Sequence, residues 1–268
     1  MRIRAGFEIA YECVNPTPML LMLNVHPSRH GDLETPDTLH VDRDVALTHY
    51  IDGFGNVCSR VLVPPGKTTF SSDFIVRDRG EPDPVLPEAR AAKVEDLPDE
   101  VMVFLLGSRY CETDRMTDLA WSLFGQTEPG LARVQAIVDY AHQRICFGYQ
   151  HARPTKTAWD AHEEGLGVCR DFAHLAITLC RCMNIPARYC TGYLGDIGIP
   201  PVDAPMDFSA WFEAYLDGAW RTFDARHNKP RIGRILMARG RDATDAAITT
   251  NFGPAFLARF KVVTEELP

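Results

Sequence analysis

Apolar and polar residues alternate along the first 80 residues of the chain. The segment Phe7-Glu8-Ile9-Ala10-Tyr11 illustrates this period of two, which is typical of strands that bury one face. Clusters rich in Pro, Asn, Asp and Gly separate such segments, as in residues 15–18 and 52–56. The pattern predicts a small β-sandwich over residues 1–80.

The pattern changes after this region. Residues 81–100 are rich in Arg, Asp and Glu, contain four prolines and show little apolar periodicity, so they predict a linker. Residues 101–268 then form a second predicted domain. Its tail, residues 231–268, again alternates apolar positions, and we expect its strands to pair within that second domain.

Helical periodicity opens the second domain. Thr117 is placed to cap a helix over residues 118–124, and apolar positions between 131 and 145 repeat with a period near 3.6. Thr157 is placed to cap a further short helix over residues 158–164. The predicted fold class is therefore α+β, with a sandwich followed by helices packed on an antiparallel sheet.

Composition and charge narrow the class of protein. The 268 residues are 46% hydrophobic and 24% charged, which suits a soluble chain with a real core. The formal net charge of −8 argues against nucleic acid and anionic lipid as partners, since both are bound by basic faces. The longest apolar run, Met19–Leu23, is too short to cross a bilayer, and no signal-peptide stretch opens the chain, so we expect a cytoplasmic protein.

The eight cysteines lack the spacing of metal ligands and are expected to be thiols in a reducing compartment. Cys180 and Cys182 are two residues apart on a predicted helix, so their side chains diverge by about 200° and cannot chelate one ion. We expect both to be buried structural thiols. No metal or cofactor is predicted.

Cys169 stands at the start of a predicted buried helix. The apolar positions that follow it share one face, and the sequence Asn184-Ile185-Pro186 ends the pattern. Unpaired backbone N–H groups and the helix dipole at this position favour a thiolate, which is the nucleophilic form of cysteine. The alternative is that Cys169 is only a small buried apolar residue.

A β-hairpin is predicted around Asp217-Gly218, which is a strong signal for a two-residue type I′ turn. In this register Glu213 pairs with Thr222, and Trp211 pairs with Asp224. One face of the hairpin then carries Ser209, Trp211, Glu213, Trp220, Thr222, Asp224 and Arg226. The other face carries Ala210, Phe212, Ala214, Phe223 and Ala225, which suits a core. Trp211, Trp220 and Glu213 are interpreted as packing and ion-pair residues.

Three segments resemble bacterial transglutaminase-like proteins. They are Gly-Val-Cys-Arg-Asp-Phe-Ala-His at 167–174, Ala-Trp-Phe-Glu-Ala-Tyr-Leu at 210–216, and Thr-Phe-Asp-Ala-Arg-His-Asn at 222–228. An Arg-Tyr-Cys segment at 109–111 and the N-terminal β-sandwich extend the resemblance over nearly the whole chain. The resemblance implies a papain-like second domain and a cysteine protease or acyltransferase that acts on peptide or glutamine-type amides through a thioester.

Carried over by position, the resemblance makes Cys169 the nucleophile and Asp224 the carboxylate that orients the catalytic histidine. The histidine belongs at position 209, where this chain has Ser209. A hydroxyl does not titrate near neutral pH, so it cannot replace an imidazole that is worth about 10²–10⁴-fold in rate. We therefore predict an incomplete triad and impaired chemistry.

The other nearby histidines are not expected to restore the base. His227 has the parity of the core face and points away from Asp224 unless the chain bends after that residue. His174 diverges from Cys169 by about 140° on the helix and is interpreted as structural. Nothing in the spacing aims His151 or His162 at Cys169.

Three hypotheses remain open on the sequence. The chain is a slow cysteine-dependent hydrolase or acyltransferase, or a peptide-binding scaffold that has lost turnover, or a variant in which Ser209 replaces a natural histidine. The expected partner is a peptide or protein amide in each case. The sequence does not identify the substrate or the oligomeric state.

Overall fold

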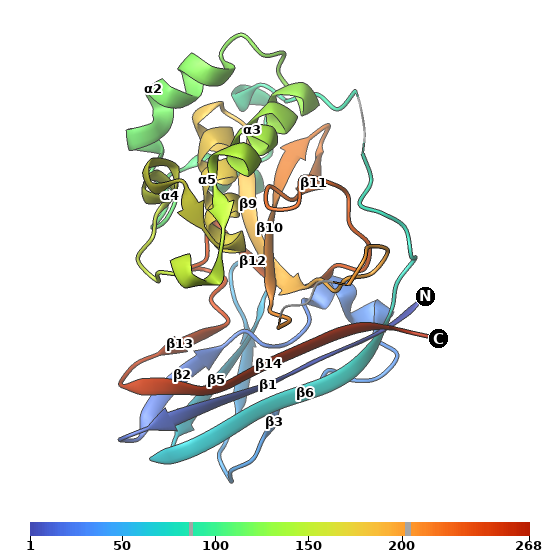
Figure 1. Ribbon diagram of the computed structural model, residues 1–268, viewed down its shortest axis with the longest axis vertical. Helices are drawn as coiled ribbons and strands as arrows, with labels where there is room; N and C mark the ends of the chain where they lie inside the picture. The colour runs from blue at the N-terminus through green and yellow to red at the C-terminus, as the bar shows by residue number, and fades with distance from the viewer. Residues whose placement is uncertain (86–87, 202–204) are drawn as a thin grey trace.

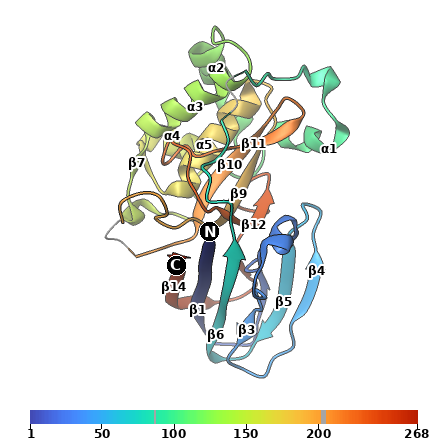
Figure 2. The same cartoon turned by 90° about the vertical axis from the view of Figure 1, so that its right-hand side faces the viewer.

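The computed structural model describes residues 1–85, 88–201 and 205–268. A β-sandwich forms one end of the molecule, and helices packed on a third sheet form the other end (Figure 1, Figure 2). The predicted α+β class and the N-terminal sandwich are confirmed.

The sandwich consists of two four-stranded antiparallel sheets. The first has the order β14 (Ala255–Leu267), β1 (Arg2–Cys13), β6 (Gly66–Arg77) and β3 (His40–Val41). The second has the order β13 (Thr249–Asn251), β2 (Thr17–Leu21), β5 (Val57–Val63) and β4 (Thr48–Ile51). Alternate residues of both sheets, such as Ile9, Leu21 and Phe70, meet in one buried core, as the period of two predicts.

The third sheet has the order β11 (Ala219–Phe223), β10 (Ser209–Leu216), β9 (Ala187–Tyr193) and β12 (Ile235–Gly240). Its longer helices are α2 (Thr113–Phe124), α3 (Leu131–Arg144), α4 (Ala158–Glu164) and α5 (Cys169–Cys182). Helix α5 is central, since it packs against β9 and β10 and contacts each of the other three helices. Nearly all of its residues are buried.

Several short elements complete the fold. They are α1 (Asp99–Met102), the parallel pair β7 (Cys146–Phe147) and β8 (Leu166–Gly167), and the 3₁₀ turns Pro27–Asp32, Val94–Asp96, Val103–Leu105 and Tyr149–His151.

The C-terminal tail does not stay in the second domain. β12 joins the third sheet as predicted, but β13 pairs with β2 and β14 pairs with β1 along its whole length, from Arg2 opposite Leu267 to Cys13 opposite Ala255. The prediction that residues 249–268 pair within the second domain was therefore wrong. Alternation identifies a strand, but it does not identify the sheet that the strand joins.

The segment between the two predicted domains is anchored to the second one. The Asp217 N–H donates to the Arg90 carbonyl, and the Arg90 N–H donates to the Asp217 side-chain Oδ1. The carbonyl of Ala89 accepts from the N–H of Leu131. The sandwich core also continues into the second body through Tyr193 and Phe208, both buried. The two bodies therefore share packing and are not independent units joined by a free tether.

Local helix signals were mostly correct. α3, α4 and α5 lie where the apolar stripes predict them, and Gly165 ends α4 in the left-handed conformation. Thr157 caps α4 through a capping box with Asp160. The cap predicted at Thr117 was wrong, because α2 begins at Thr113 and the Thr117 hydroxyl donates to the Thr113 carbonyl within the helix.

Replacing Thr157 by Ala is expected to lower the free energy of unfolding by about 1 kcal/mol, because the Asp160 N–H loses its capping oxygen. Urea denaturation measures the change. Thr117→Ala is the matched control, since its hydroxyl caps no helix, and we expect a smaller change there. Equal losses in the two variants would contradict a capping role for Thr157.

Candidate functional site

Cys169 is the first residue of α5, as predicted. The chain reaches it through Val168, whose N–H donates to Asp171 Oδ2 at 2.9 Å and so closes the first turn. Gly167 precedes this turn because a Cβ there would lie 2.8 Å from the Cβ of Asp171. The sequence therefore places the sulfur at the helix start through a tight approach that only glycine allows.

Cys169 opens into a groove of about 590 Å³ between the two bodies. Ser209 and Ala210 of β10, together with Tyr189 of β9, line the groove on the side of the second body. The sandwich contributes the opposite wall with apolar side chains of β1 and β14, namely Ile9, Tyr11, Leu257 and Phe260. The structure thus brings Cys169 and Ser209 into one groove and adds a sandwich wall that the sequence did not predict.

The environment of Cys169 favours the neutral thiol. Burial raises the pKa of this thiol to about 11, although the Arg226 guanidinium and the backbone N–H groups of Ala210 and Arg170 act to lower it. The position at the helix start favoured a thiolate in the sequence analysis, with a small buried apolar residue as the alternative. The helix dipole stabilises a thiolate at this position, but removal of the sulfur from solvent destabilises it more. No imidazolium is among the groups that act on the sulfur and could offset this cost.

Ser209 lies at the start of β10 and is buried. Within the described part of the chain its Oγ has no hydrogen-bond partner. A buried hydroxyl without a partner costs free energy, and native proteins seldom leave one so. The Ser209 hydroxyl is therefore not fixed by hydrogen bonds to described residues.

The hairpin has the predicted register from Phe212 opposite Phe223 to Leu216 opposite Ala219, but the predicted pair of Trp211 with Asp224 does not form, because the strand pairing ends at Phe223. Glu213 faces Thr222, and Asp217 and Gly218 have φ of 50° and 69°, as a type I′ turn requires. Its core face, which carries Ala210, Phe212, Ala214, Phe223 and Ala225, packs in the same cluster as α5. Glu213 accepts a hydrogen bond from Arg188 at 2.6 Å, which confirms its interpretation as an ion-pair residue.

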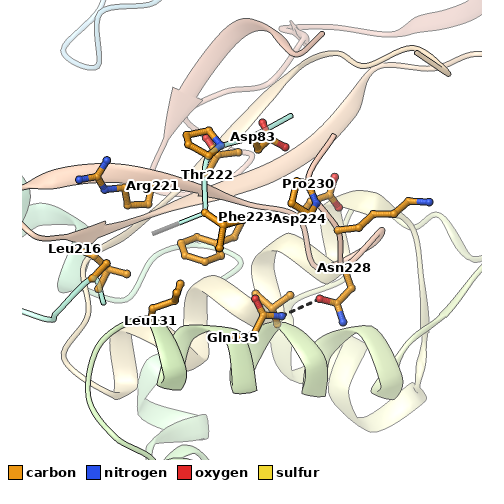
Figure 3. Close-up of a pocket in the computed structure, with 15 residues that line it drawn as sticks. Asp83, Leu131, Gln135, Leu216, Arg221, Thr222, Phe223, Asp224, Asn228 and Pro230 are labelled. Carbon is orange, nitrogen blue, oxygen red and sulfur yellow. Dashed lines mark hydrogen bonds between the residues drawn. The ribbon is translucent and has the colours of Figure 1, made fainter. Parts of the chain in front are cut away.

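Asp224 follows the last residue of β11 and lies outside the groove. It borders a small cavity of about 90 Å³ beside α3, where Figure 3 places it with Thr222 and Phe223 across from Leu131 and Gln135. Its Oδ2 accepts from Arg234 Nη2 at 2.8 Å and lies 2.8 Å from His227 Nδ1.

The Arg234 guanidinium that donates to Asp224 also lies over the Trp211 ring, 5.1 Å from its centre. Burial alone would raise the pKa of the Asp224 carboxyl. The hydrogen bonds from His227 and the charge of Arg234 outweigh that effect and hold the pKa well below its usual range.

His227 contacts Asp224 and does not point away from it. Strand pairing ends at Phe223, and residues 225–227 form a turn that brings the His227 N–H to Asp224 Oδ1 at 2.9 Å. The sequence allowed for this contact only if the chain bends after Asp224, and it does. The aspartate thereby serves as the acceptor that organises its own turn.

The remaining histidines are not among the described residues that line the groove of Cys169. His174 is buried, stacks on Tyr110 with ring centres 5.0 Å apart and accepts from the Ala243 N–H at 3.1 Å. Burial lowers the pKa of His174, so it is a neutral structural residue, as predicted. His162 contacts Tyr140, and neither it nor His151 is among the residues that line the groove.

Two arginines have roles that the sequence did not predict, although Arg226 was expected on the polar face of the hairpin. Arg226 lies over the Phe147 ring at 3.8 Å and acts electrostatically on Cys169, and its position two residues after Asp224 was a usable signal. Arg234 had no such signal, because its contact with Asp224 depends on how the chain returns after residue 228.

In residues 1–85, 88–201 and 205–268 no three His, Cys, Asp or Glu side chains are arranged to hold a metal ion. Over the same residues, no helix combines the length and apolarity needed to cross a bilayer.

Comparisons with known proteins agree on one family. A family model described as the transglutaminase-like superfamily matches residues 117–225. A crystal structure of a candidate cysteine protease from Cytophaga hutchinsonii is 30% identical, with a TM-score of 0.86 over 100% of this chain and 91% of that one.

Two uncharacterised mycobacterial proteins are also similar. The protein of Mycobacterium leprae is 36% identical over 94 residues, which is 33% of this chain and only 32% of that protein. The protein of Mycobacterium bovis is 29% identical over 217 residues, 72% of this chain and 68% of that protein.

Proposed function

Because this chain belongs to the transglutaminase-like superfamily, we propose that it binds peptide or glutamine-type amides beside Cys169 and that its turnover is severely impaired. The observation that carries the proposal is the lining of the groove. Cys169 and Ser209 share it, and no histidine is among the described residues that line it.

The chemistry explains the impairment. In amide cleavage through a thioester, a bond forms between Cys169 Sγ and the carbonyl carbon, and the amine leaves after it gains a proton. An imidazole accepts the thiol proton and then delivers it to the amine. Ser209 can do neither step at neutral pH, and the high pKa of the Cys169 thiol leaves little thiolate to attack.

The groove still suits a ligand. Its volume of about 590 Å³ is in the range of small-molecule and peptide side-chain sites. The apolar wall of Leu257 and Phe260, both more than 40% exposed, offers area for an apolar side chain of a peptide. Backbone N–H groups of Arg170 and Ala210 lie near the sulfur and can donate to a carbonyl oxygen placed there.

The second candidate function is a peptide-binding scaffold without turnover. It is favoured because the Asp224 carboxylate is already engaged by other side chains. That carboxylate is held by Arg234 and His227, and it does not line the groove. Cytoplasmic localisation also stays a proposal, supported by eight cysteines that are all free.

Alkylation of Cys169 by iodoacetamide tests the state of the thiol. We expect its pH midpoint near 11, because burial disfavours the thiolate. Mass spectrometry of peptides measures it, with the exposed Cys146 as a reference in the same digest. A midpoint below the free-thiol value of about 8.5 would mean that the site is activated.

The same assay tests binding. A glutamine-containing peptide with apolar neighbours is expected to slow alkylation of Cys169 and to leave Cys146 unchanged. If peptides at millimolar concentration protect neither cysteine, the proposal of a peptide site fails.

A further inference from the structure

A second cavity, of about 530 Å³, lies on the face of the hairpin that points away from α5. Trp211, Glu213 and Thr222 line it from β10 and β11, and Asp78 and Asp83 line it from the end of β6 and the segment that follows. It shares no lining residue with the Cys169 groove. It is therefore separate from the site of the proposed function.

The lining of this cavity holds five carboxylates, from Asp32, Asp78, Glu81, Asp83 and Glu213, and also six arginines. The arginines are Arg29, Arg77, Arg79, Arg231, Arg234 and Arg239. The carboxylates in the lining already have cationic partners in several cases. Arg29 pairs with Asp32 and Asp78, Arg234 pairs with Asp83, and Glu213 is paired by Arg188, which lies outside the lining. Arg77 pairs with Glu34, and Arg231 lies 4.0 Å from Asp196. The lining therefore carries little net positive charge, and a ligand would be held by individual guanidinium N–H groups that have no acceptor.

Two of these arginines are buried and hold unused donors. The side chains of Arg231 and Arg234 are 2% and 7% exposed. Arg231 Nη2 donates to the Gly195 carbonyl at 2.8 Å, and Arg234 is fixed by Asp83 and Asp224. Among the described residues, Arg231 Nε and Arg234 Nη1 have no acceptor.

Unpartnered guanidinium donors at such burial call for an acceptor. A buried charged donor without a partner costs more than a neutral one, and a bound anion removes that cost. The guanidinium groups are already oriented by their other contacts, so a ligand would lose little free energy in arranging them. This distinguishes the cavity from a surface patch of flexible cations.

We propose that this cavity binds a small molecule that carries a phosphate group. Several guanidinium groups from different segments suit a tetrahedral dianion with many acceptor oxygens better than a single carboxylate. The volume of about 530 Å³ exceeds the size of free phosphate and matches a small-molecule site. The indole of Trp211, on which Arg234 stacks, offers an apolar wall for the remainder of the ligand.

Isothermal titration calorimetry at neutral pH and fixed ionic strength tests the proposal. Inorganic phosphate is the first probe, and phenyl phosphate is the second. We expect saturable binding of phosphate with a Kd of about 1 mM or tighter, and none of chloride. Tighter binding of phenyl phosphate would assign the site to the phosphoryl group of a larger molecule, and equal binding would assign it to the free ion.

Arg231→Gln and Arg239→Gln are expected to weaken phosphate binding about tenfold, the loss of one charge-assisted hydrogen bond. Arg239 is the less buried of the two, so at least one variant should stay folded. Arg259→Gln is the matched control, because Arg259 pairs with Glu8 outside the cavity. The absence of saturable heat from both probes, or folded variants that bind like the parent chain, would overturn the proposal.

Discussion

Replacing Ser209 by His is expected to raise amide hydrolysis by at least about 10²-fold, since general acid and base help is typically worth 10²–10⁴-fold. The new imidazole would enter the groove that Cys169 lines and could pair with its thiolate. That pairing should move the alkylation midpoint of Cys169 from near 11 down toward neutral pH. Release of amine from a glutamine-containing peptide measures the rate.

Two variants make this experiment decisive. Ser209→Asn is the size-matched control, because an amide cannot accept the thiol proton at neutral pH. The double variant Ser209→His with Cys169→Ser should return to background if the sulfur is the nucleophile. If Ser209→His changes neither the rate nor the alkylation profile, the assignment of position 209 to this site is wrong.

Replacing Asp224 by Asn is expected to lower the free energy of unfolding by about 3–5 kcal/mol, which is typical when one partner of a buried ion pair is removed. Arg234, 7% exposed, would keep a buried charge with only Asp83 to compensate it. Urea denaturation measures the loss. The control is Asp73→Asn, whose partner Arg4 is 46% exposed, and a surface pair of that kind is worth at most about 1 kcal/mol.

The pH dependence of this difference has a defined sign. The pKa of Asp224 is lowered in the folded state, so its contribution is complete above the unfolded value of about 3.9 and disappears as the pH falls toward the folded value. The gap in stability between the parent chain and Asp224→Asn should therefore narrow below about pH 4. A gap that stays constant down to pH 2 would contradict the ion pair.

Local features of this fold could be read from the sequence because each depends on a few neighbouring residues. The cap at Thr157, the turn at Asp217-Gly218 and the helix start at Cys169 are all of this kind. The hairpin register followed from the turn, and so did the separation of its core face from its polar face.

The features that were missed depend on contacts between distant segments. β14 completes the sandwich because it pairs with β1, which is far away in the sequence. Arg234 reaches Asp224 because the loop between β11 and β12 returns the chain to the hairpin. The pKa of the Cys169 thiol is another example. The helix start was visible in the sequence, but the burial that outweighs it depends on tertiary packing.

The pairing of β1 with β14 has a consequence for the order in which the chain can fold. During synthesis β1 is made long before β14, which covers its edge, so this edge of the sandwich stays open until β14 has emerged. The third sheet and its helices meet no such delay, because α5 and strands β9 to β12 are close in sequence. The sandwich is thus completed only after the chain that forms the second body has been made.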